Sequence, residues 1–303
     1  MSGLTATVLS AAEQPDYWLQ LCPRMSISDL PFAKAISPYR IDDHARDQSV
    51  KNIIEEGYFR LPPTVLEEDC ERLAEAIRNV TDAGFPAPFA LIYDEFWQLF
   101  ANLSEIAKPL LGSKIRISPG DLWAWNVGPS GSSQGWAPHR DLTDPDSLQP
   151  DGRPKHLTLW IPFTDATAMN GCMYVLPTHL DPNVPGNLKS RDIAPEQFQS
   201  IRALTVDAGA ILGWNSRILH WGSKSTRYAK QARINVALYL MHDDGTLNYG
   251  VEMLPQQPVP FWYRVGAIAG AMRLFQDSPL SGELHYQPEL VAFAKKFLDR
   301  LQG

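Results

Sequence analysis

A histidine and an aspartate two positions apart, in the segment GWAPHRDL, are the residues of this sequence best suited to chemistry. They are His139 and Asp141, with Arg140 between them. Alternate side chains of a β-strand project to the same face, so both residues could bind one metal ion while Arg140 points away. Two imidazoles and one carboxylate bind Fe(II) on one face and leave positions open for other ligands. His220, at the end of the apolar run RILHW, is the predicted third ligand.

An arginine follows His220 at the start of another strand-like run, RINVALYLM. A guanidinium is planar, always charged and able to hold a carboxylate through two parallel hydrogen bonds. Arg233 is therefore the predicted contact for a dicarboxylate cosubstrate. Arg227, closer to His220, is the alternative.

Two other His-x-Asp pairs compete with the first. His179 and Asp181 lie between CMYVLPT and DPNVPGN, a segment typical of a turn that leaves a strand, and ligands in a loop are less well held. His242 and Asp244 have no histidine and arginine downstream at comparable spacing. We therefore rank the 179 pair second and reject the 242 pair.

Composition narrows the possible partners. A net charge of −7 and a pI near 5.5 argue against nucleic acid and anionic membranes, and no apolar run is long enough to span a bilayer. The first residues lack a basic region followed by an apolar core, so no secretory signal is expected. Three scattered cysteines do not make a disulfide framework, and the predicted location is the cytoplasm.

The elements that must position these residues follow from hydrophobic periodicity. Residues 50–56 predict a short helix and YFRL a strand, while Thr64 and Glu67 form a capping-box pattern before an amphipathic helix. A second amphipathic helix should end before Gly112. From about residue 114 short apolar runs recur between turn residues, which is typical of antiparallel strands. These runs are IRIS, DLWAWNV, the approach to His139, HLTLWIPF, GCMYVLP, ALTV, AILGW with RILHW, and RINVALYLM.

About eight such strands predict a mainly β fold with flanking helices, whose core is a double-stranded β-helix of the jelly-roll or cupin-like kind. We expect a single domain over 1–303. Residues 1–113 form an N-terminal helical support, 114–242 the catalytic jelly roll, and 243–303 a C-terminal extension with a closing helix.

The chain resembles the phytanoyl-CoA dioxygenase family of Fe(II)- and 2-oxoglutarate-dependent oxygenases over roughly residues 48–242. The resemblance is carried by EEGYFRLPPTVL, the HRD, LTLWIPFTDATAMNGCMYVLPTH, VDAGAIL and LHWGSKSTRYAKQARINVAL. Within these segments NGCMYVLPTH is the most specific, and it assigns His179 to a strand end away from the metal.

The resemblance implies roles for particular residues. His139, Asp141 and His220 would bind iron as the catalytic centre, and Arg233 would pair with the distal carboxylate of 2-oxoglutarate. The cosubstrate would also contact three further residues, Trp160, Ser223 and Asn126. Trp221 is inserted between His220 and Gly222, so the serine stands three positions after the histidine where relatives have two, which puts Ser223 in doubt.

The expected activity is hydroxylation, or another oxidation, of an unactivated C–H bond with O2, releasing succinate and CO2. Asp141 favours this over halogenation, because halogenating relatives have a small residue in place of the acidic ligand. The expected substrate is a small molecule, with secondary metabolites and lipid-like or ring-containing compounds as candidates. Two alternatives stay open: a non-oxidative cupin-like isomerase or hydrolase, and a non-catalytic ligand-binding jelly roll. Oligomeric state is not predicted.

Substrate contacts should come from the segments that flank the HRD. Residues 129–138 and 142–156 are rich in Gly, Ser, Pro and Asp, and we weigh a lid at the site mouth equally with an ordinary surface loop. Trp123 is expected in the core, and Trp136 is left open between core and substrate site. Three nearby cations are expected to be ordinary solvated charges, namely Arg140, Arg153 and Lys155.

Overall fold

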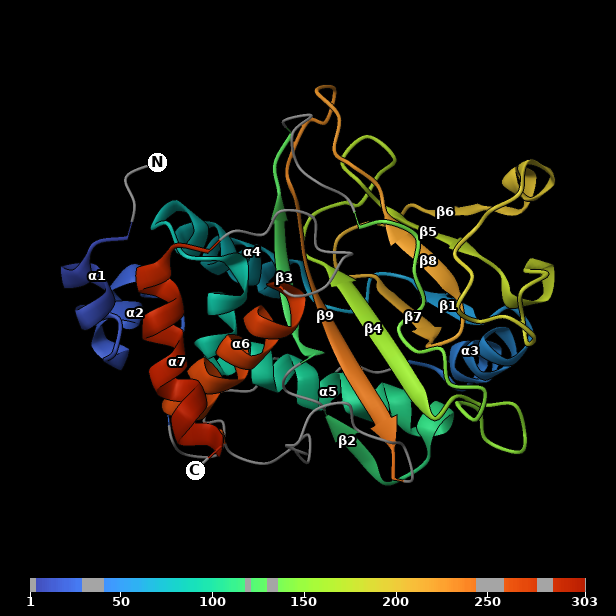
Figure 1. The fold of residues 1–303 in the computed structure, drawn as a ribbon, viewed down its shortest axis with the longest axis horizontal. Coiled ribbons are helices and arrows are strands. Elements are labelled where there is room, and N and C mark those ends of the chain that lie inside the picture. The colour runs from blue at the N-terminus through green and yellow to red at the C-terminus, as the bar shows by residue number, and fades with distance from the viewer. Residues whose placement is uncertain are drawn as a thin grey trace.

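The computed structural model describes residues 4–28, 41–117, 121–129, 136–243, 259–276 and 286–302. Two antiparallel sheets occupy the middle and right of the view in Figure 1, and helices gather at the left and beneath them. One sheet has the order β1-β7-β4-β9-β2, with β3 also paired to β9, and the other has the order β6-β5-β8. The strands are β1 (Tyr58–Leu61), β2 (Ile115–Ile117), β3 (Trp123–Val127), β4 (His156–Pro162), β5 (Met173–Leu176), β6 (Arg202–Leu204), β7 (Ile211–Asn215), β8 (Leu219–Gly222) and β9 (Arg233–His242).

Strand β4 lies between β7 and β9 and is buried at every position. Its odd-numbered residues, such as Leu159, join the core beneath the helices, while Trp160 joins a second core between the two sheets. Val236 and Ala237 of β9 divide between the two cores in the same way. The fold therefore has the predicted jelly-roll core, with a helical share larger than "mainly β" suggests.

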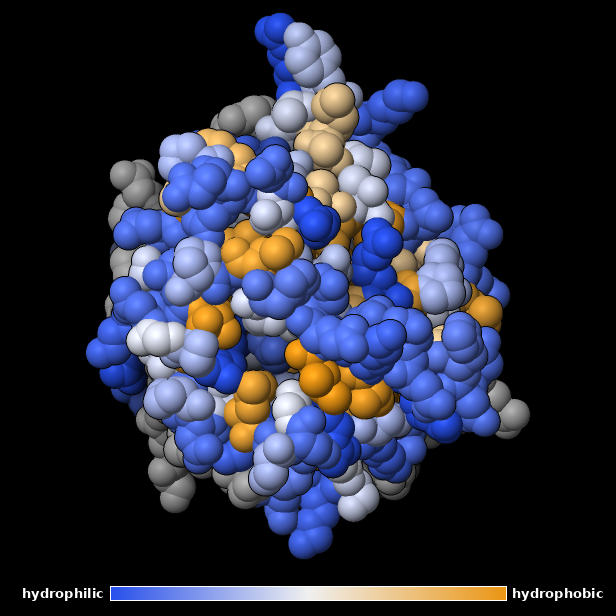
Figure 2. Space-filling view, turned by 90° about the vertical axis from the view of Figure 1, so that its right-hand side faces the viewer, coloured by the Kyte–Doolittle hydropathy of each residue, from blue (hydrophilic) through white to orange (hydrophobic). Residues whose placement is uncertain are grey.

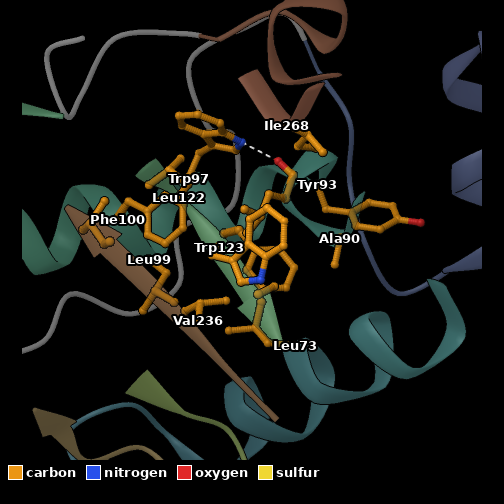
Figure 3. Packing of buried hydrophobic residues seen from close by; sticks show 14 of the residues in the cluster. Leu73, Ala90, Tyr93, Trp97, Leu99, Phe100, Leu122, Trp123, Val236 and Ile268 are labelled. Carbon is orange, nitrogen blue, oxygen red and sulfur yellow. Dashed lines mark hydrogen bonds between the residues drawn. The ribbon is translucent and has the colours of Figure 1, made fainter. Parts of the chain in front are cut away.

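Helices cover one face of the larger sheet, and in the described part of the chain they contact β3, β4 and β9. Figure 3 shows this core, where side chains such as Leu73, Phe100 and Ile268 from three helices meet Trp123 and Val236 from two strands. The helices are α1 (Ala6–Ala11), α2 (Pro15–Leu21), α3 (Asp43–Glu55), α4 (Glu67–Asp82), α5 (Asp94–Leu111), α6 (Phe261–Gln276) and α7 (Pro288–Gln302), with 3-10 turns η1 (Ala87–Ile92), η3 (Thr178–Leu180) and η4 (Pro195–Ser200).

The sequence predicts the end of helix α5 correctly and the start of helix α4 wrongly. Helix α5 ends at Gly112, whose φ of 95° suits a residue without a Cβ, as predicted. The capping box predicted for α4 is wrong. Thr64 donates its hydroxyl to Pro62, its N–H bonds to the carbonyl of Gly209, and the helix begins after Leu66 without a side-chain cap. Pairing with a distant loop holds this segment extended.

Helix α6 was not predicted, because its sequence FWYRVGAIAGAM is apolar on nearly all sides and has no clear amphipathic period. It packs against α7 and η1. A buried ion pair anchors it, with Nη1 of Arg264 at 2.6 Å from Oδ1 of Asp94 on α5. The same guanidinium donates to the carbonyls of Ile92 and Val259, both at 2.7 Å. The predicted closing helix is α7.

The three cysteines are free and buried. Within the described ranges, no helix combines the length and the apolar content needed to cross a membrane. The face in Figure 2 is mostly hydrophilic, with hydrophobic residues in separate groups.

Candidate metal centre and cosubstrate pocket

The two histidines among the predicted ligands, His139 and His220, are joined by a single β-bridge instead of a continuous strand pair. The N–H of His139 bonds to the carbonyl of His220 at 3.0 Å, and the reverse bond measures 2.9 Å. Asp141 lies in a bend, and Leu142 bonds to Ser216. The strand predicted for the HRD is therefore wrong beyond this one pair, although the pair is enough to set His139 against β8.

Three possible ligand atoms converge between the two sheets. Oδ1 of Asp141 lies 3.4 Å from Nε2 of His220 and 3.9 Å from Nε2 of His139, and the three groups lie within 4.8 Å of one another. Neighbouring ligands on one ion lie about 3 Å apart, because each metal–ligand bond measures about 2.0–2.2 Å. The cluster therefore fits a small divalent cation after minor adjustment.

The two imidazoles are oriented for metal binding by carbonyl groups close in sequence. Nδ1 of His139 lies 2.8 Å from the carbonyl of Ala137, and Nδ1 of His220 lies 3.2 Å from that of Ile218. Each contact selects the tautomer with hydrogen on Nδ1, which leaves the lone pair of Nε2 for a metal. Burial, together with the neighbouring His220, lowers the pKa of His139 to about 4, so its ring is neutral near pH 7 without a metal.

The carboxylate of Asp141 is held from one side. Its Oδ2 accepts hydrogen bonds from Oγ1 of Thr158 at 2.6 Å and from Nε1 of Trp214 at 3.1 Å, which leaves Oδ1 facing the histidines. Thr158 on β4 pairs in register with Trp214 on β7, so the two donors come from adjacent strands. Sequence reasoning missed both. The available sequence signal was that Thr158 and Trp160 are two positions apart on β4, so their side chains project to the same face.

Arg140 is buried, and its prediction as a solvated charge is wrong. Its guanidinium pairs with Asp181, with side chains 1% and 0% exposed, and donates to the carbonyls of Leu188 and Ser190. Asp181 is the carboxylate of the competing 179 pair, so its role here is to neutralise Arg140. His179 lies on the surface near Glu56.

The other two nearby cations are also less solvated than expected. The Arg153 side chain is 28% exposed and pairs with Asp151 at 2.7 Å, and the Lys155 side chain is 14% exposed and pairs with Asp146 at 3.1 Å.

Arg233 is 2% exposed and lacks an ion-pair partner among the described residues. Its Nη1 donates to Oδ1 of Asn235, its Nε has no hydrogen-bond partner, and its guanidinium carbon lies 5.6 Å above the ring of Trp160. Burial lowers the pKa of Arg233 to about 10, which still leaves it charged. An isolated buried cation is costly, so this position suits an anionic ligand.

Two glycines leave space beside this guanidinium. A Cβ at Gly222 would lie 3.8 Å from Nη2 of Arg233 and 3.6 Å from the sulfur of Met173. At Gly171, where φ is 91°, a Cβ would lie 2.5 Å from the carbonyl oxygen of Ser223. The glycine of the NGCMYVLPTH segment therefore permits the close approach of two backbone segments next to Arg233.

The other residues predicted to contact 2-oxoglutarate do not line the cavity. Ser223 follows Gly222, and its buried hydroxyl has no partner among the described residues, but it does not line the cavity. Asn126 does not reach the site, because its amide donates to the hydroxyl of Thr81 on α4 at 2.8 Å. Arg227 is exposed and donates to the hydroxyl of Tyr228 at 2.6 Å.

A cavity of about 350 Å³ contains both the candidate metal ligands and Arg233. Unexpectedly, helix α6 contributes to its wall. The cavity is lined by Asp121, Trp123, Trp125, Trp136, His139, Arg140, Asp141, Thr158, Trp160, Met173, Trp214, His220, Gly222, Arg233, Ala237, Tyr239, Leu274 and Phe275. Of the predicted flanking loops, residues 130–135 lie outside the described residues.

Comparisons with known proteins agree with this architecture. The model of the phytanoyl-CoA dioxygenase (PhyH) family matches residues 94–230. A comparison with curated proteins found no match. The solved structure of the non-heme alpha ketoglutarate dependent epimerase SnoN, from nogalamycin biosynthesis, is 16% identical with a TM-score of 0.54, covering 72% of this chain and 93% of its own. Another SnoN structure is a complex with Fe3+, alpha ketoglutarate and nogalamycin RO, with a TM-score of 0.52.

Two further solved structures share the fold. The non-heme alpha ketoglutarate dependent carbocyclase SnoK is 20% identical with a TM-score of 0.53, covering 73% of this chain and 94% of its own. EctD from S. alaskensis is 15% identical with a TM-score of 0.50, covering 77% and 91%. The family match includes all three candidate metal ligands, and Arg233 lies just beyond it. Residues 94–230 therefore match the model of the phytanoyl-CoA dioxygenase family, the family that the sequence resembles.

Proposed function

We propose that this protein is an Fe(II)- and 2-oxoglutarate-dependent oxygenase that hydroxylates a small molecule. The observation that carries the proposal is one cavity with two complementary features. It holds a His-Asp-His cluster and, separately, a buried guanidinium that lacks a carboxylate partner within the described residues. A dicarboxylate that chelates a metal at one end and meets Arg233 at the other satisfies both.

The residues present fit both groups. His139, Asp141 and His220 would hold the iron through Nε2, Oδ1 and Nε2, because their other polar atoms are engaged in hydrogen bonds. Arg233 would hold the distal carboxylate of 2-oxoglutarate, with Trp160 beneath its guanidinium. When bound, iron and 2-oxoglutarate supply O2-dependent oxidation of a C–H bond, with release of succinate and CO2.

The protein's own contribution is orientation and exclusion of water. Thr158 and Trp214 hold the Asp141 carboxylate in one orientation, which keeps a single oxygen available. The apolar and aromatic wall keeps the site dry, so the reactive centre meets the bound substrate more often than solvent.

Arg233 also helps to distinguish the proposed oxygenase from the two alternative functions. A non-oxidative cupin-like metal enzyme does not require a buried arginine beside its metal ligands, and a non-catalytic jelly roll does not require the converging histidines.

The type of reaction is a separate question from the type of enzyme. SnoN and SnoK are called an epimerase and a carbocyclase, so product analysis should look for epimerisation and ring closure besides hydroxylation.

The decisive experiment is anaerobic calorimetric titration of 2-oxoglutarate into protein loaded with Fe(II). We expect binding by the wild type and a loss of about tenfold to a hundredfold in affinity for Arg233→Met, since hydrogen bonds to charged groups contribute roughly 1.5–3 kcal/mol. Arg227→Met is the matched control and should bind like the wild type. Equal affinities for the Arg233 and Arg227 variants would refute the assignment.

Oxygenase activity is tested independently by substrate-dependent release of succinate. His139→Ala should abolish it, since the variant lacks one metal ligand. Turnover by this variant, or anaerobic turnover without 2-oxoglutarate, would favour a different enzyme class.

A further inference from the structure

Tyr239 lines the metal cavity, and its hydroxyl has no assigned role. The oxygen is buried and has no hydrogen-bond partner among the described residues. Burial, with the carboxylates of Asp141 and Asp121 nearby, raises the pKa of Tyr239, so the hydroxyl keeps its proton. An unpaired buried hydroxyl is costly, so a partner is expected in the working protein.

The sheet register places Tyr239 relative to the candidate metal ligands and Arg233. Tyr239 on β9 is paired with Thr158, the residue that donates to Asp141. Arg233 lies six residues earlier on the same face of β9, roughly 20 Å away along an extended strand. Ala237, the small residue between them, faces Trp160. Tyr239 is therefore near the metal ligands and far from the position assigned to the distal carboxylate.

Aromatic rings line one wall of the cavity, close to His139. The ring centroid of Phe275 on α6 lies 5.4 Å from that of Trp136 and 4.4 Å from that of Trp123. The ring of Trp136 in turn lies 6.0 Å from that of His139. Flat apolar surfaces of this kind favour a ring system that can stack beside the metal.

The charges of the cavity point to the same kind of ligand. Among the described lining residues, the permanent positive charges are those of Arg140 and Arg233. Asp181 neutralises the first, and 2-oxoglutarate would neutralise the second. Among the described residues that line the cavity, no cation therefore remains for a phosphate, sulfate or coenzyme A group of a substrate.

We propose that the substrate is a ring-containing molecule without anionic groups, and that Tyr239 determines specificity by donating its phenolic proton to an oxygen of that substrate. This inference rests on the proposed function, because it assigns Arg233 to 2-oxoglutarate. It separates this chain from an acyl-CoA oxidising enzyme, whose substrate is a polyanion.

Two probes with the same ring system test the charge and the hydroxyl. Anaerobic protein loaded with Fe(II) and 2-oxoglutarate is titrated with 2-naphthol, which is neutral at pH 7, and with naphthalene-2-sulfonate, which is anionic. We expect 2-naphthol to bind at least about tenfold more tightly. Equal or tighter binding of the sulfonate, or binding of neither probe, would overturn the proposal.

The role of Tyr239 is tested with Tyr239→Phe, which keeps the ring and removes the hydroxyl. We expect about a tenfold loss in 2-naphthol affinity, with naphthalene, which lacks the oxygen, binding equally to both proteins. Tyr228→Phe, at an exposed tyrosine, is the matched control and should bind like the wild type. An unchanged 2-naphthol affinity in Tyr239→Phe would refute the role.

Failure of this inference is distinguishable from failure of the proposed function. If 2-oxoglutarate binds in an Arg233-dependent manner while the probes show no preference, only the substrate class is wrong. If 2-oxoglutarate does not bind, both proposals fall. Succinate release driven by an acyl-CoA would leave the oxygenase standing and refute the uncharged substrate.

Discussion

The buried pair between Arg140 and Asp181 allows the sharpest prediction about stability. Asp181→Asn nearly preserves shape but leaves the Arg140 guanidinium as an uncompensated buried charge. Removing one partner of such a pair typically costs about 3–5 kcal/mol, and both side chains here are almost fully enclosed. We therefore expect Asp181→Asn to lower the free energy of unfolding by about that amount.

Arg140→Met should cost more, because it also removes the donors to the carbonyls of Leu188 and Ser190. The double variant Arg140→Met with Asp181→Leu removes both charges, and leaves unpaired the two carbonyls and the N–H of Asn183, which donates to Oδ1 of Asp181 at 2.9 Å. Its loss should therefore be smaller than the sum of the two single losses by about 3 kcal/mol.

The assay is reversible urea unfolding of metal-free protein, followed by tryptophan fluorescence. Asp299→Asn is the control, because it breaks an exposed ion pair with Lys295 and should change stability by less than about 0.5 kcal/mol. A loss below about 1 kcal/mol for Asp181→Asn would refute the reasoning. So would a double variant whose loss equals the sum of the single losses.

Three further predictions concern the site and the core. Thr158→Val should weaken Fe(II) binding by about tenfold or more, because the Asp141 carboxylate loses its shorter hydrogen bond. Thr158→Ser should restore the affinity in the same titration. Equal Fe(II) affinities for the Val and Ser variants would contradict this prediction. Gly171→Ala should lower both the melting temperature and the affinity for 2-oxoglutarate, because the added Cβ would lie 2.5 Å from the Ser223 carbonyl oxygen. An unchanged melting temperature would contradict this prediction. Burial raises the pKa of Cys70 to about 12, and the other two thiols are also buried. The folded protein should therefore resist a thiol reagent at pH 8 that modifies all three cysteines after unfolding. Rapid labelling of the folded protein would contradict this prediction.

Local patterns explain how much of the fold could be predicted from sequence. Short apolar runs between turn residues marked most strands, and the apolar stripe ending at Gly112 marked α5, because both depend on residues close in the chain. The capping box at Thr64 failed because a distant carbonyl, that of Gly209, took the N–H of Thr64. Helix α6 was missed because a helix buried on nearly all sides has no polar face to reveal its period.

The sequence by itself determined which residue types could bind a metal and a dicarboxylate: two histidines, an aspartate and an arginine at suitable spacings. Only the tertiary structure showed what surrounds each competing carboxylate, since it places Asp181 against Arg140 and Asp141 between Thr158 and Trp214. Ligand identity is a property of residue type and short spacing, which the chain carries directly. Burial, charge compensation and the cavity wall depend on segments far apart in sequence, so they exist only once the two sheets and α6 have packed together.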